Sequence, residues 1–182
     1  MFKALISIIQ PKDFDSITSI SNACFGLNYI TTKLLSNMLS EPGIYNKIVL
    51  ENKLIGFCLA QILNTETKDL EFEIPDLQQE EKIAVIKTIA IHPNYQRKGF
   101  GTQLLKQVVH QINGVAEVYS IYYPSWIESE SDGFSKSVKN EGFKEFKLYQ
   151  NFWLNDSLKH NYTCIRCGNP PCKCSMKLYR KK

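Results

Sequence analysis

Two short stretches of this 182-residue chain combine residue types whose spacing could support chemistry. The first runs from Gln96 to Gly101 and reads QRKGFG, with two cations and two glycines directly before an amphipathic helical pattern. A helix start already carries about half a positive charge, so added cations are favourable there only when an anion occupies the position. Glycine lets backbone amides approach such an anion closely. The pattern predicts a turn that binds pyrophosphate.

Two common phosphate-binding motifs do not fit this turn. A P-loop requires lysine and then serine or threonine after its last glycine, but Gly101 is followed by Thr102 and Gln103. A dinucleotide-binding fingerprint requires a third glycine where Leu104 stands. A plain strand-to-helix turn would explain the glycines, but it would leave the two cations unexplained.

The second stretch lies near the end of the chain, where four cysteines follow the pattern C-x2-C-x4-C-x-C: Cys164, Cys167, Cys172 and Cys174. Four thiolates can surround zinc as a tetrahedron, and such a site has no open position for catalysis. The cluster therefore predicts a structural Zn²⁺ site that fixes a loop beside a substrate groove. Reduced thiols, or disulfides formed after purification, are the alternatives. The other two cysteines, Cys24 and Cys58, lie among apolar neighbours and are expected to be buried.

The composition is that of an ordinary globular protein, with 43% hydrophobic and 22% charged residues. The net charge of +4 is mild, and much of it comes from the last residues, KLYRKK, so it does not by itself predict a nucleic-acid partner. No apolar run reaches the roughly 20 residues that a membrane span requires, so no membrane partner is expected. The short apolar start is followed by Pro11, without a signal-peptide cleavage pattern, which predicts a cytoplasmic protein. A homodimer is compatible with these data.

Hydrophobic periodicity predicts a single α/β domain over residues 1–182 with a mixed sheet. A hairpin supplies antiparallel strands, and a strand–helix–strand unit supplies a parallel pair. A Cys-rich loop at 164–174 is expected between the last two strands, and a connecting loop at 64–81. The expected strands are 3–10, two within 45–63, 82–92, 116–124, 144–154 and 175–181. The expected helices are 13–26, 31–40, 100–112 and 132–143.

The glycine turn and its surroundings carry a resemblance to a known family. The turn fits the pattern [QR]-x-x-G-x-[GA], follows the strand KTIAIHPNY and precedes a long amphipathic helix. A later helix closes with Glu141-Gly142-Phe143. With the element order, these features resemble the GNAT superfamily of N-acetyltransferases from about Lys3 to Lys181. The resemblance implies a mixed, mostly antiparallel central sheet flanked by helices.

The resemblance also implies acetyl-CoA as co-substrate and places its binding residues. The turn would hold the pyrophosphate, mainly through backbone amides, with Gln96, Arg97, Lys98, Gly99, Phe100, Gly101 and Thr102. The pantetheine arm would pair like an extra strand with the backbone of Ile89, Ala90 and Ile91. It would lie where strand 82–92 parts from strand 117–123, and the amide of Ile89 or Ala90 would polarise the thioester carbonyl.

The implied reaction is transfer of an acetyl group to a primary amine of a small molecule or protein, but no catalytic residue is assigned. Val138 stands where the family often has a tyrosine acid, and Ser131 stands where it has an asparagine. The possible substitutes, each also compatible with a purely structural role, are Tyr122, Tyr123, Glu80, Glu81 and His92. Two other functions stay open: a non-catalytic acyl-CoA-binding sensor, and an interaction module that uses the zinc loop.

Overall fold

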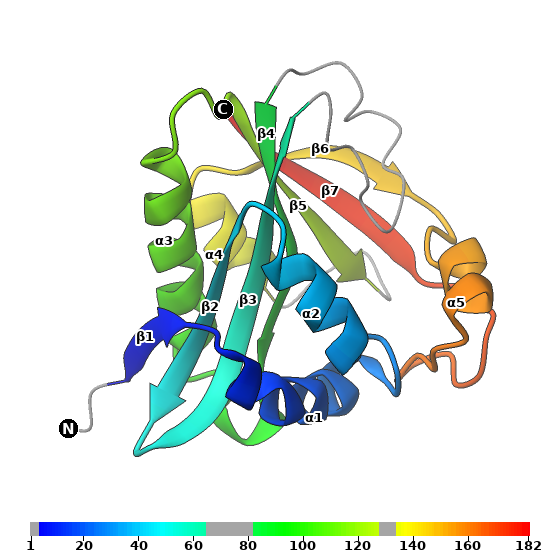
Figure 1. Ribbon diagram of the computed structural model, residues 1–182. Helices are drawn as coiled ribbons and strands as arrows, with labels where there is room; N and C mark the ends of the chain where they lie inside the picture. The colour runs from blue at the N-terminus through cyan, green and yellow to red at the C-terminus, as the bar shows by residue number, and fades with distance from the viewer. Residues whose placement is uncertain (1–3, 65–81, 128–133) are drawn as a thin grey trace.

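A computed structural model describes residues 4–64, 82–127 and 134–182, and these residues form a seven-stranded sheet with helices on both faces (Figure 1). The strands are β1 (Leu5–Ile8), β2 (Gly43–Leu50), β3 (Lys53–Asn64), β4 (Lys82–Ile91), β5 (Ser120–Ile127), β6 (Lys144–Tyr149) and β7 (Ser175–Lys181). The α-helices are α1 (Phe14–Phe25), α2 (Thr32–Leu39), α3 (Phe100–Asn113), α4 (Ser135–Asn140) and α5 (Leu154–His160). Within these described ranges, no helix is long and apolar enough to cross a bilayer.

The sheet has the order β1-β2-β3-β4-β5-β7-β6. The β4–β5 pair is parallel, and the other five pairs are antiparallel. This arrangement confirms the expected mixed, mostly antiparallel sheet flanked by helices.

Both faces of the sheet are covered because the helices are amphipathic. On one face, α3 buries the five apolar residues of its helical stripe, namely Leu104, Leu105, Val108, Val109 and Ile112. On the other face, α1 and α2 bury Ile17, Ile20 and Leu35 against Phe57 and Leu59 of β3. The helix that follows the glycine turn is therefore fixed by the largest hydrophobic cluster of the fold.

A β-bulge interrupts the middle of β4. Thr88 pairs with Leu59 and Ile86 pairs with Ala60, which leaves Lys87 as an extra residue. Because side chains alternate along a strand, one extra residue exchanges the two faces. Before the bulge, the even-numbered buried residues of β4 pack with α3; after it, the odd-numbered ones do.

The two central parallel strands separate soon after they meet. Their pairing extends only from Ile83 opposite Ser120 to Val85 opposite Tyr122. Beyond these residues β4 and β5 spread apart as the two arms of a V (Figure 1). The predicted parting of the two strands is confirmed, and it leaves one edge of β4 open from Ile86 onward.

Several predicted boundaries were wrong. Strand 3–10 shortens to β1, and strand 116–124 begins only at Ser120. The predicted strand 144–154 ends at Tyr149, where a turn with Asn151 in the left-handed region leads into α5. Helix α5 was missed because its seven residues are too few to show a helical period. The predicted loop lies, apart from Asn64, outside the described residues.

Candidate active site

The glycine turn has the backbone of an anion-binding helix start. Gly99 lies at the N-cap of α3 with φ +84°, and Arg97 is also left-handed with φ +62°. Because the N-cap residue is a glycine, it has no side chain to accept a hydrogen bond from the amides of the first turn, and among the described residues these amides are left for another acceptor. A Cβ on Gly99 would have no neighbour within 4 Å among the described residues. No described residue therefore fills the space beside Gly99.

The side chains around the turn hold its shape. The Gln96 Nε2 donates a hydrogen bond of 2.8 Å to the carbonyl of Ile91, which ties the turn to the end of β4. The Lys98 Nζ donates to the carbonyl of Asn94 at 3.1 Å and lies 5.5 Å from the ring centroid of Tyr95. These contacts support the turn from behind. The prediction that Gln96 contacts the cofactor stays a prediction.

Helix α4 packs against the start of α3. The hydroxyl groups of Thr102 and Ser137 are hydrogen-bonded at 2.7 Å. A Cβ on Gly101 would lie 3.1 Å from the ring of Phe134. The second glycine of the motif is thus needed for close packing here as well as for access to the amides.

The open edge of β4 presents alternate backbone groups. The N–H of His92 donates to the carbonyl of Ile55 on β3 at 2.8 Å. By alternation, the backbone N–H and C=O groups of Ala90 also point towards β3, whereas those of Ile89 and Ile91 point into the gap between β4 and β5. The carbonyl of Ile91 already accepts the hydrogen bond from Gln96. Of the three residues predicted to pair with the pantetheine arm, only Ile89 and Ile91 therefore present backbone groups to the gap. Ile89 is the stronger candidate to polarise the thioester carbonyl.

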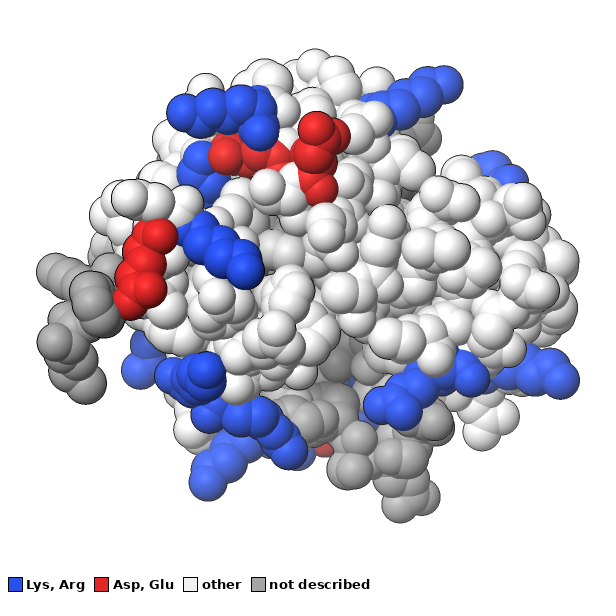
Figure 2. Space-filling model, turned by 90° about the horizontal axis from the view of Figure 1, so that it is seen from below, with Lys and Arg blue, Asp and Glu red and all other residues white. Residues whose placement is uncertain are grey.

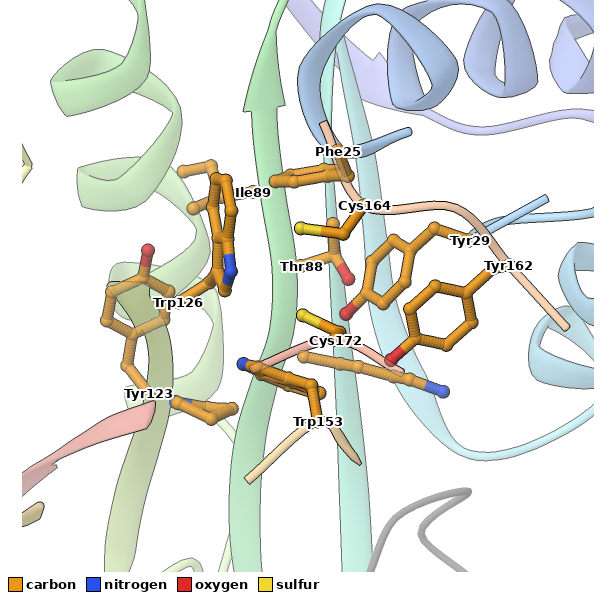
Figure 3. Close-up of a pocket in the computed structure, with 12 residues that line it drawn as sticks. Phe25, Tyr29, Thr88, Ile89, Tyr123, Trp126, Trp153, Tyr162, Cys164 and Cys172 are labelled. Carbon is orange, nitrogen blue, oxygen red and sulfur yellow. The ribbon is translucent and has the colours of Figure 1, made fainter. Parts of the chain in front are cut away.

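A pocket lined by aromatic side chains adjoins Ile89 (Figure 3). Phe25 is the last residue of α1 and Tyr29 lies in the loop after it, and their ring centroids are 5.3 Å apart. Tyr29 also contacts Tyr162 at 5.3 Å and Trp153 at 6.3 Å, both edge-on. Trp126 of β5 closes the opposite side of the pocket, and its ring centroid lies 6.5 Å from that of Phe25. Such a pocket can surround a flat or apolar group while it excludes water.

Few polar groups reach this pocket. Thr88 is 4% exposed, and its hydroxyl has no hydrogen-bond partner among the described residues. Lys87, the bulge residue, also lines the pocket. The Tyr162 hydroxyl donates to Asp156 at 2.7 Å, and burial together with this carboxylate raises the pKa of Tyr162 far above its usual value. Tyr162 therefore keeps its proton at any physiological pH.

The residues named as substitute acids or bases fall in different places. Tyr123 lines the pocket. Tyr122 is fully buried in a separate cluster, with the guanidinium of Arg180 at 5.4 Å from its ring centroid. His92 accepts a hydrogen bond from the N–H of Asn94 at 3.3 Å and does not line the pocket. Glu80, Glu81 and Ser131 lie outside the described residues.

Val138 is fully buried in the α3 cluster, so an apolar side chain fits its position. The pocket tyrosines that sequence reasoning missed are Tyr29 and Tyr162, which come from irregular segments. A usable signal was the presence of only two tryptophans, at positions 126 and 153. Both line this pocket.

The four tail cysteines converge as predicted. Their sulfur atoms all lie within 4.8 Å of one another. The Sγ of Cys174 is 3.8 Å from that of Cys164 and 3.5 Å from that of Cys167, and Cys167 and Cys172 are 4.0 Å apart. A ZnS4 tetrahedron with Zn–S bonds of about 2.3 Å has edges of about 3.8 Å. All four cysteines are free thiols, and the cluster could hold a metal ion.

Backbone amides support two of these sulfurs. The N–H of Arg166 donates to the Sγ of Cys164 at 3.4 Å, and the N–H of Lys173 donates to the Sγ of Cys167 at 3.3 Å. Such hydrogen bonds orient metal ligands and stabilise their thiolate form. Without a metal, burial raises the pKa of the Cys174 thiol to about 12. Binding a cation here would have to release protons.

Comparison with protein families decides the assignment. The family model described as the acetyltransferase (GNAT) family matches residues 14–123, which include β4, the glycine turn and most of the sheet. The chain belongs to the GNAT family of acetyltransferases. Membership in this family indicates acetyl-CoA-dependent N-acetylation. A search of curated proteins finds no significant match.

Solved structures similar to this GNAT protein share its fold at low sequence identity. The ribosomal-protein-S18-alanine N-acetyltransferase of Escherichia coli aligns with a TM-score of 0.69 and 15% identity, over 98% of this chain and 93% of that one. Arabidopsis thaliana NAA60 in complex with acetyl-CoA aligns with a TM-score of 0.72 and 15% identity, over 98% of this chain and 97% of that one. Arabidopsis thaliana Naa50 in complex with the bisubstrate analogue CoA-Ac-MVNAL aligns with a TM-score of 0.69 and 14% identity, over 98% of each chain.

Proposed function

We propose that this GNAT protein transfers the acetyl group of acetyl-CoA to a primary amine of a small molecule or a protein. One observation carries the proposal: the open edge of β4 at Ile89 lies between an uncapped helix start and an aromatic pocket. A cofactor held by its pyrophosphate at Gly99 could extend along β4. An amine in the pocket would then approach the thioester from the other side.

In the proposed reaction the amine nitrogen attacks the thioester carbon. A C–N bond forms, the C–S bond breaks, the amine loses one proton, and the coenzyme A thiolate takes one up. The N–H of Ile89 is positioned to donate to the carbonyl oxygen as negative charge develops there. The phenol group of Tyr29 also reaches the pocket. The Tyr162 hydroxyl donates a hydrogen bond to Asp156 and keeps its proton.

The lining favours an amine attached to an apolar or flat group. Six aromatic residues line the pocket, and aromatic rings bind such groups through large contact areas. Of the similar structures, one is a ribosomal-protein-S18-alanine N-acetyltransferase and another holds the bisubstrate analogue CoA-Ac-MVNAL. Protein N-termini therefore belong in the tested panel beside small amines.

The decisive experiment incubates the full chain with acetyl-CoA and a panel of peptides and small amines, followed by mass spectrometry. We expect an acetylated product and an equal amount of free coenzyme A, with apolar or aromatic amines preferred. Tight acetyl-CoA binding without any acetylated amine would instead support the sensor alternative.

The interaction-module alternative predicts nucleic-acid binding that weakens steeply with salt. On the face seen from below, Lys and Arg side chains lie in separate groups, with uncharged surface and acidic side chains among them (Figure 2). This distribution differs from the continuous basic surface that such binding uses. We therefore expect little duplex or RNA binding at physiological salt, which a fluorescence-anisotropy titration would measure.

We also propose that Cys164, Cys167, Cys172 and Cys174 bind one structural Zn²⁺. The proposal is supported by sulfur spacings that match a ZnS4 tetrahedron and by the burial of three of the four side chains. Metal analysis of protein purified without chelators should find about one zinc per chain. The Cys167→Ser variant should lose most of it, whereas Cys58→Ser, which lies outside the cluster, should keep it. A metal-free wild-type protein with intact thiols would contradict the proposal.

Thr88→Val should separate stability from activity. Removing a buried hydroxyl that lacks a partner should leave the free energy of unfolding unchanged or raise it by about 1 kcal/mol. If the amine substrate supplies the missing partner, its KM should rise about tenfold, which corresponds to a lost hydrogen bond of about 1.4 kcal/mol. Thr88→Ser keeps the hydroxyl and should keep the KM. An unchanged KM in the valine variant would show that the hydroxyl does not contact the substrate.

A further inference from the structure

The cysteine cluster and the aromatic pocket share side chains. Cys164 and Cys172 belong to the group of four that could hold a metal ion, and both also line the pocket. In Figure 3 these two side chains lie between β4 and the rings of Tyr29 and Tyr162. The proposed zinc site therefore forms part of the pocket wall.

The segment that carries the first cysteine is bound to the loop after α1. The N–H of Thr163 donates to the carbonyl of Leu27 at 3.0 Å, and the N–H of Leu27 donates to the Thr163 hydroxyl at 2.7 Å. The N–H of Ile165 donates to the carbonyl of Phe25 at 2.8 Å. This loop also supplies Tyr29, so the position of Cys164 determines where two aromatic rings of the pocket lie.

The other cysteines reach the remaining walls. The N–H of Cys172 donates to the buried hydroxyl of Ser157 on α5, at 2.8 Å. Trp126, near the end of β5, packs against the hydrophobic cluster that includes Cys164, Cys172 and Cys174. Three separate parts of the chain, namely the loop after α1, the end of β5 and helix α5, thus meet at the four sulfurs.

The segment 164–174 contains no helix or strand of its own and only one isolated bridge, between Cys164 and Gly168. Such a segment needs a cross-link to hold a fixed shape, because ordering each residue costs about 1–2 kcal/mol of backbone entropy. A bound metal ion supplies that cross-link, since its binding energy becomes folding energy.

We propose that the zinc ion assembles the acceptor pocket and leaves the cofactor site independent of it. This inference rests on the proposed function and the proposed metal. With zinc bound, the segment 164–174 holds the rings of Phe25, Tyr29 and Trp126 around the gap at Ile89. When zinc is removed, the walls separate and the acceptor loses its site. The glycine turn keeps its shape, because it is held by Gln96 and by the packing of α3.

The test uses the full chain with zinc bound, after chelation, and after zinc is restored. Metal content is measured in each sample, coenzyme A binding by calorimetry, and the pocket by tryptophan emission, since both tryptophans of the chain line it. Chelation should shift the emission to longer wavelength while the Kd for coenzyme A changes by less than about twofold. The KM for the best amine of the panel should rise by about tenfold or more, as expected for the loss of a packed aromatic contact. Restoring zinc should reverse both changes.

The matched variants are Cys167→Ser and Ile165→Ser. Cys167 is exposed and does not line the pocket, so its substitution should reproduce the emission shift only through the metal. Ile165 is exposed in the same segment and binds no metal, so its variant should behave like the wild type. Zinc release without an emission shift would overturn the inference, and so would a parallel loss of coenzyme A binding. A protein that binds zinc and shows the emission shift but acetylates no amine would instead refute the proposed function.

Discussion

Gly99→Ala should weaken coenzyme A binding by about tenfold or more while the protein stays folded. Gly99 has φ +84°, a conformation that costs a non-glycine residue about 1–2 kcal/mol. Relief of that strain would turn the first-turn amides of α3 away from their common focus. The added methyl group would also occupy space beside the turn that no described residue fills. Isothermal titration with coenzyme A measures the effect directly.

Gly142→Ala is the matched control for this change. Gly142 has a similar φ of +88° at the end of α4, and its Cβ would meet only the flexible side chain of Lys181. This variant should lose similar stability but keep its affinity for coenzyme A. Equal affinities in the two variants would mean that the glycine turn does not hold the cofactor.

Gly26→Ala should destabilise the protein by about 3 kcal/mol or more, as overpacking and backbone strain combine. A Cβ at this position would lie 2.1 Å from the carbonyl oxygen of Thr163, which is backbone and cannot turn aside. The φ of +119° adds further strain. The loop after α1 would have to move away from the cysteine segment, so the aromatic pocket should open as well. Chemical denaturation followed by tryptophan emission measures both effects.

Gly168→Ala is the control for Gly26→Ala, because it introduces backbone strain without a steric clash. Gly168 also has a positive φ, of +79°, but its Cβ would meet nothing within 4 Å among the described residues. This substitution should therefore lower the free energy of unfolding by only about 1 kcal/mol. If the two variants were equally stable, close packing of the loop after α1 on the cysteine segment would not contribute to the fold.

Much of the cofactor side of the site could be predicted from sequence because its signals are local. The spacing of Gly99 and Gly101, the stripe on α3 and the apolar run of β4 all lie within about thirty consecutive residues and follow regular periods. The cysteine spacing is equally local. These patterns were enough to predict the sheet, the glycine turn and the convergence of four sulfurs.

The acceptor side could not be predicted in the same way. Tyr29, Trp153 and Tyr162 come from turns and from the edges of a seven-residue helix, where no period exists. They meet only through tertiary contacts such as the bond from Ile165 to Phe25. The bulge at Lys87 could not be predicted from an apolar run without alternation, and neither could the face of the sheet on which the Thr88 side chain lies.

After the extra residue in β4, the consecutive residues Thr88 and Ile89 have different roles. Thr88 turns its side chain into the aromatic pocket, whereas the partly buried side chain of Ile89 packs against the hydrophobic cluster that contains α3. The peptide group of Ile89 faces the gap towards β5. A library of substitutions at position 88 would consequently vary which amines are accepted without altering the peptide group that meets the thioester. Selectivity and reactivity in this scaffold can therefore be evolved one at a time.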